Sequence, residues 1–109
     1  MTDDEIQALK AKYAGADLRI ISNDELEIEI VVDAKKLARE WPRFRALLQD
    51  DAQEMQAHKM LVLAGIVEPS AEAFRALIEE RSLPACWEIL ANQCGKIVGA
   101  SRATKHKKI

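Results

Sequence analysis

The sequence predicts an α+β domain in which an N-terminal β-hairpin packs on a bundle of four to five helices. The chain has 109 residues, the length of one ordinary domain, and 49% of them are hydrophobic. Apolar residues alternate with charged ones over residues 25–30, as in a strand, and recur every three to four positions after residue 34, as in helices. We assign residues 1–101 to one domain and expect residues 102–109 to form a basic, disordered tail.

The first element is a short helix. Thr2 and Glu5 have the spacing of a capping box, and Gly15 is a natural stop. The apolar residues between them follow helical spacing: Ile6, Leu9 and Tyr13. This stripe is narrow, so we expect the helix to dock loosely.

A β-hairpin follows, with strands over 18–22 and 25–32 and a turn at 22–25. One face of the second strand is apolar, and it comprises Leu26, Ile28, Ile30 and Val32. The other face carries Glu25, Glu27 and Glu29. We expect the glutamates to face solvent, with a surface for a metal or a cationic partner as the alternative. A lone hairpin is marginally stable, so its apolar face must cover helices or pair with another copy.

From residue 34 on, the pattern predicts helices only. Pro42 either kinks the first of them or starts a new one, and the segment 60–67 is apolar on all sides, as at the centre of a fold. Breaks are expected at 68–70, with Ser70 as an N-cap, and at 82–84. The predicted inward residues are Leu37, Trp41, Phe44 and Leu48, then Phe74, Leu77 and Ile78, and finally Trp87, Leu90, Cys94 and Ile97 or Val98.

The sequence offers little chemistry. Cys86 and Cys94 are too far apart in one predicted helix to form a disulfide, so we expect free, buried thiols. His58, expected on a mostly polar stretch, and His106 have no partners at metal-ligand spacing, and no glycine-rich run forms a phosphate loop. We therefore expect no catalytic residues, no cofactor and no metal: the chain is not predicted to be an enzyme.

Charge is spread unevenly along the chain. The net charge is −2, which excludes a generally basic nucleic-acid binder, yet residues 96–109 carry five basic residues and no acidic one. The two ends are either simply solvated, or used for head-to-tail association or for contact of the basic tail with an acidic partner. The acidic start differs from a signal peptide, and the longest apolar run, residues 60–67, is too short to span a bilayer, so we expect a cytoplasmic protein that binds no membrane.

Several apolar residues are candidates for a partner or self-association surface. They comprise three residues of the hairpin face and two aromatic residues that fit either a core or an interface: Leu26, Ile28, Ile30, Trp41 and Phe44. Because a small domain with an apolar hairpin face can bury it against a second copy, we expect a homo-oligomer.

Several phrases of the sequence resemble the small tail assembly chaperones of long-tailed bacteriophages and prophages. They are Glu29-Ile30-Val31-Val32 leading to Trp41-Pro42-Arg43-Phe44-Arg45, the run from Leu61 to Ser70, the run from Phe74 to Glu80, Leu83-Pro84, and a helix closing on Val98-Gly99. The resemblance covers residues 16–100. One difference follows the hairpin, where the family often has Arg or Lys and then Pro, and this chain has Asp33-Ala34-Lys35.

The resemblance implies a non-catalytic protein of the host cytoplasm that oligomerises during tail morphogenesis. Its partners would be the tape measure protein and the tail tube protein, and it would be absent from the mature virion. The alternative is a small prophage-encoded adaptor or regulator whose basic tail, residues 102–109, contacts nucleic acid. We consider direct nucleic-acid binding the weaker hypothesis, because no aromatic residue is interleaved with the basic ones.

Overall fold

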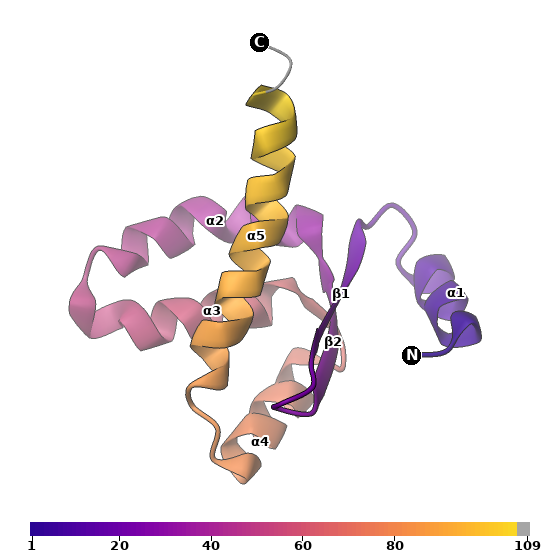
Figure 1. Ribbon diagram of the computed structural model, residues 1–109, viewed down its shortest axis with the longest axis horizontal. Helices are drawn as coiled ribbons and strands as arrows, with labels where there is room; N and C mark the ends of the chain where they lie inside the picture. Colours follow the sequence, from indigo (N-terminus) through magenta and orange to yellow (C-terminus); the bar gives the residue numbers. More distant parts are fainter. Residues whose placement is uncertain (107–109) are drawn as a thin grey trace.

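The computed structural model has an α+β fold, as predicted, and it describes the backbone of residues 1–106 and the side chains of residues 1–99 (Figure 1). Its elements in chain order are α1 (Asp3–Lys12), β1 (Leu18–Asn23), β2 (Ile28–Asp33), α2 (Ala34–Leu48), the 3-10 helix η1 (Asp51–Gln53), α3 (Glu54–Gly65), β3 (Ile66–Glu68), α4 (Ala71–Arg81) and α5 (Cys86–His106).

The three strands form one antiparallel sheet in the order β1-β2-β3. The prediction that only helices follow residue 34 is wrong, because Ile66–Glu68 pairs with β2 through Val31 and Val32. These residues continue the apolar run of α3, and periodicity alone does not separate a short apolar strand from a buried helix. The β-branched pair Ile66 and Val67 favours the strand.

The hairpin turn is longer than the sequence indicates. Asp24–Glu27 forms the turn, so β2 begins at Ile28 and not at residue 25. The Leu26 amide donates to Asn23 Oδ1 at 2.9 Å, and Glu27 has a positive φ of 53°. From the end of α4, Arg81 Nη2 donates to the Leu26 carbonyl oxygen at 2.6 Å, which ties the turn to a distant helix.

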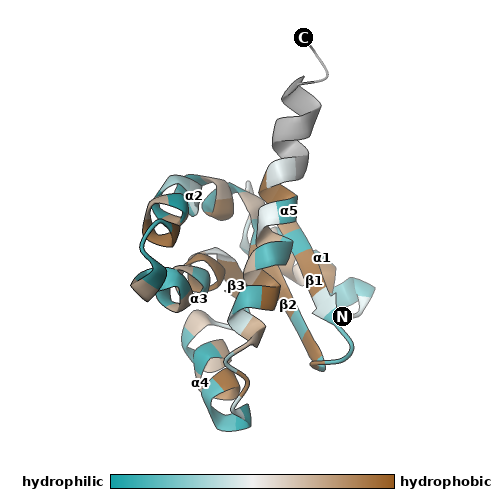
Figure 2. Cartoon of the chain, turned by 60° about the vertical axis from the view of Figure 1, so that its left-hand side comes forward, coloured by the Kyte–Doolittle hydropathy of each residue, from teal (hydrophilic) through white to brown (hydrophobic). Residues whose placement is uncertain are grey.

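One face of the sheet contributes to the main core. The buried residues Ile21, Ile28, Ile30 and Val32 belong to the same cluster as buried residues of α2, α3, α4 and α5. Helix α1 lies on the other side of the strands, where Leu9 is buried (Figure 1). The predicted arrangement therefore holds only in part, since α1 does not join the other helices. Figure 2 shows the connection between α2 and α3 in hydrophilic colours, as expected for a solvated loop.

Local signals place most helix ends. Thr2 caps α1 and Ser70 caps α4, where its hydroxyl accepts from the Ala73 amide at 3.2 Å. Asp33 caps α2, which then continues through Pro42, so Pro42 does not start a new helix. Asp50 caps the turn before α3, where its side chain accepts from the Ala52 amide.

One further expectation needs correction, and one stays largely untested. Leu77 is 39% exposed, because the core-facing side of α4 is formed by Phe74 and Ile78, one helical turn apart. The backbone of residues 102–106 continues α5, a segment with neither Gly nor Pro. Residues 107–109 lie outside the described chain, and so do the side chains from residue 100 on, so the predicted disorder and phosphate contacts there stay predictions.

Candidate protein-binding groove

The residues predicted as an association surface lie mainly inside the core. Ile28, Ile30 and Phe44 are buried, and Leu26 and Trp41 are partly buried against the same cluster. The Trp41 and Phe44 rings pack with centroids 5.1 Å apart. The apolar hairpin face was expected either to cover helices or to pair with another copy. In the structure it covers helices of its own chain. A partner can contact only the exposed parts of Leu26 and Trp41 in this folded state.

The two thiols and the described histidine are also buried. Cys86 and Cys94 are free and buried, as predicted, and burial raises the pKa of Cys86 to about 11 and that of Cys94 to about 12. His58 is buried, contrary to the polar setting expected, and its ring lies 5.8 Å from that of Phe44. Within the part of the chain that the structure describes, no three His, Cys, Asp or Glu side chains are placed to hold a metal ion.

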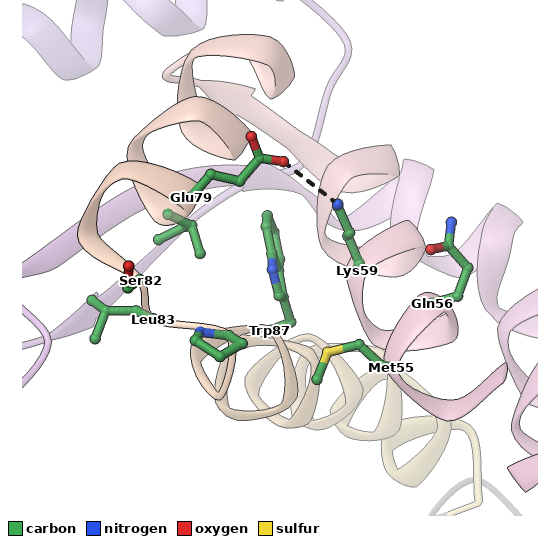
Figure 3. A pocket seen from close by; sticks show the side chains of 9 residues that line it. Met55, Gln56, Lys59, Glu79, Ser82, Leu83 and Trp87 are labelled. Carbon is green, nitrogen blue, oxygen red and sulfur yellow. Dashed lines mark ion pairs between the residues drawn. The ribbon is translucent and has the colours of Figure 1, made fainter. Parts of the chain in front are cut away.

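An open groove of about 400 Å³ lies where α3, the end of α4 and the start of α5 meet (Figure 3). We call it the Trp87 groove. Its lining residues come from all three helices and from the α4–α5 connection: Met55, Gln56, Lys59, Ile78, Glu79, Ser82, Leu83, Pro84 and Trp87.

The break between α4 and α5 shapes one wall of this groove. Ser82 ends α4 in the left-handed conformation, with φ 52° and ψ 51°. The Leu83 amide then donates to the Ile78 carbonyl oxygen at 3.2 Å, and the Cys86 amide donates to the Leu83 carbonyl oxygen at 3.1 Å. The chain therefore reverses within a few residues and places Leu83 and Pro84 beside the first turn of α5, as the predicted break at 82–84 requires.

The floor of the groove is apolar and its rim is charged. The Trp87 indole is only 4% exposed and packs edge-on against Phe74, with ring centroids 5.6 Å apart. Above it, Lys59 Nζ lies 5.8 Å from the Trp87 ring centroid and 4.0 Å from Glu79 Oε1 (Figure 3). The Lys59 ammonium group is thus attracted by both the face of the Trp87 ring and the Glu79 carboxylate. These two interactions hold the Lys59 side chain at this side of the rim.

These groups suit binding of an apolar side chain. Met55 is 52% exposed at the edge of the groove and offers a flexible, unbranched thioether. The lining contains neither histidine nor cysteine, and Lys59 and Glu79 pair with each other. An apolar floor inside a polar rim is the usual composition of a protein-binding surface.

The sequence predicts the burial of some residues that line this groove, but it does not predict the groove itself. Trp87 and Ile78 are buried, as expected from their helical spacing. The pattern gives no prediction for Met55, because this residue lies in a polar stretch, between Glu54 and Gln56. A large apolar side chain in such surroundings is the signal that could have identified it.

No protein-family model, curated protein or solved structure matched this chain. Among the helices that the structure describes, none combines the length and the hydropathy needed to cross a bilayer.

Proposed function

We propose that this chain is a non-catalytic assembly factor that covers apolar helices of other proteins, as the tail assembly chaperones of bacteriophages do. The Trp87 groove is the observation that supports this proposal most directly, because it is open and apolar with a charged rim. The proposed clients are the tape measure protein and tail tube subunits. The chain would act in the host cytoplasm and leave before the virion matures.

In this proposal an amphipathic client helix lies across the groove. One apolar side chain enters against Ile78 and Trp87, and the Lys59 and Glu79 charges face polar positions on the flanks of that helix. The Met55 side chain adapts to apolar groups of different shape, so the same groove accepts successive segments of a long client. Binding to each segment is weak, since the contact area is small, and weak binding suits a factor that must be released.

Several copies would act together on one long client. Large apolar side chains remain exposed at Met55, Leu77 and Ile89, on three different helices. Association through such residues is concentration-dependent, so sedimentation velocity at increasing protein concentration is the measurement that tests it.

The test uses a purified helical fragment of a tape measure protein that precipitates when alone. We expect the chain to suppress light scattering by this fragment. Met55→Glu should abolish suppression by placing a charge at the groove, whereas Ala76→Glu, at an exposed position of α4 outside the groove, should leave suppression intact. A wild-type chain that leaves the scattering unchanged would refute the proposal. A shift of labelled DNA at low salt that is lost when residues 102–109 are removed would favour the regulator instead.

A further inference from the structure

The outer edge of β1 carries backbone groups that pair with no other strand among the described residues 1–106. The Asp17 carbonyl oxygen accepts from the Ala34 amide at 2.8 Å, so the backbone of Asp17 hydrogen-bonds on the β2 side. Along an antiparallel strand, residues whose N–H and C=O groups point to the partner strand alternate with residues whose groups point away from it. Arg19, Ile21 and Asn23 therefore direct their amides toward β2. Leu18, Ile20 and Ser22 direct their N–H and C=O groups to the open edge.

Helix α5 runs along this edge at a distance that leaves a groove. The groove has a volume of about 370 Å³ and lies between β1 and the middle of α5. Its lining comprises Arg19, Ile20, Ile21, Ser22, Gln93, Lys96 and Ile97. An open strand edge with a helix beside it is a recurring arrangement for binding an extended peptide, which adds to the sheet as a further strand.

The charges on the walls indicate the kind of peptide. Arg19 and Lys96 are cationic, and the lining contains no acidic residue. Asp17 accepts from Arg19 Nε at 2.9 Å and from Nη2 at 3.2 Å, and these bonds do not use Nη1. Arg19 shares a face with Ile21, which is buried toward α5, so an added strand meets on that face the Arg19 guanidinium, whose charge Asp17 partly offsets, and the Lys96 ammonium.

The opposite face of an added strand meets an apolar side chain. Ile20 is 47% exposed and lines the space beneath α1. An extended peptide with acidic residues toward Arg19 and Lys96, and small apolar residues beside Ile20, would match both faces at once.

We propose that the β1 edge and α5 form a second binding site, which takes an extended acidic segment of a partner protein as a fourth strand. A second copy of this chain is the less suitable occupant, because pairing two β1 edges brings two Arg19 and two Lys96 cations together. The site uses none of the residues of the Trp87 groove, so it goes beyond the proposed chaperone function and stands or falls separately.

The test titrates the full chain with a fluorescein-labelled peptide that has Glu at alternate positions and Val or Thr between them. We expect saturable binding, and binding at least about tenfold weaker for the matched peptide with Lys in place of Glu. Lys96→Glu should reverse this preference, whereas Lys36→Glu, an exposed position on α2, should not change it. Ile20→Pro should abolish binding by removing an outward amide while leaving the bonds to β2 in place.

Amide hydrogen exchange provides the second measurement. Bound peptide should slow exchange at Leu18, Ile20 and Ser22 and leave Arg19 and Ile21 unchanged. Equal binding of the Glu and Lys peptides, or no added protection at these three amides, would overturn the proposal. Protection that instead grows with protein concentration and without peptide would also overturn it, in favour of pairing between two copies.

Discussion

Gly65 lies directly against the side chain of Leu37, so closely that a Cβ atom at Gly65 would overlap Leu37 Cδ2. Gly65 is the last residue of α3, and Leu37 lies in the first turn of α2. The two helices can approach this closely only because glycine has no side chain. Leu37 is fully buried at this contact, so the surrounding core leaves it little room to move.

Gly65→Ala should therefore lower the free energy of unfolding by about 1–3 kcal/mol, because the added methyl overpacks the core. Urea denaturation is the measurement. Gly99→Ala is the control: a Cβ there meets no described atom within 4 Å, and alanine in the helix should add up to about 1 kcal/mol. Equal stability of Gly65→Ala and the wild type would contradict this account of the contact.

Asp33 joins the hairpin to α2. Its Oδ1 accepts from the Lys35 amide at 3.0 Å and from the Asp17 amide at 3.2 Å. Asp33→Ala should lower the free energy of unfolding by about 1–2 kcal/mol, because it removes an N-cap and leaves two amide donors without this acceptor. Thermal or urea unfolding is the measurement. Asp33→Asn keeps an oxygen at that position and should retain most of the stability. A loss as large for Asn as for Ala would show that charge, and not hydrogen bonding, is what matters there.

Two neighbouring substitutions in β2 distinguish its faces. Ile28 is 5% exposed in the core, so Ile28→Lys buries an unpaired ammonium group and should leave the chain unfolded by circular dichroism. Glu29 is exposed, and its carboxylate accepts from the Met1 amine at 2.8 Å. Glu29→Lys should fold with a melting temperature within a few degrees of the wild type. An unchanged melting temperature for Ile28→Lys would refute the described orientation of the strand.

The buried thiols predict alkaline instability. Burial raises the pKa of Cys86 to about 11 and that of Cys94 to about 12, above the ordinary value of 9.0. The protonated thiols contribute stability that is fully present below pH 9 and is lost as the pH rises toward 11. Urea unfolding at pH 7.5 and pH 10 should show this loss, and a Cys86→Ala, Cys94→Ala double variant should show a smaller one.

Thiol reactivity provides an independent test of the burial of Cys86 and Cys94. At pH 8, a disulfide reagent should react slowly with the folded chain and rapidly in denaturant, because native thiolate is scarce and inaccessible. Fast reaction in the folded state would contradict the burial of both cysteines.

Local signals account for what the sequence predicted well. The Thr2 and Ser70 caps, the alternation through Ile28 and Ile30, and the break after Arg81 depend on neighbours within a few residues. Such signals survive in almost any tertiary setting, so they predict the class of fold and most helix ends.

The features that the sequence did not predict depend on tertiary neighbours. Ile66–Glu68 becomes a strand because β2 offers it an edge, and His58 is buried because Phe44 on α2 lies beside it. The Trp87 groove needs three helices at a fixed mutual angle, and the β1 groove needs α5 to stand off from an edge strand. No window of sequence contains both sides of either site.

The hydrogen bond from Arg81 to the Leu26 carbonyl joins positions that are 55 residues apart. While a ribosome makes the chain, the hairpin emerges long before the helix end that fastens its turn, and also before β3, the strand that completes its sheet. Until then the nascent N-terminal third has an incomplete sheet with unpaired backbone N–H and C=O groups. Native packing is completed only after the second half of the polypeptide has left the exit tunnel.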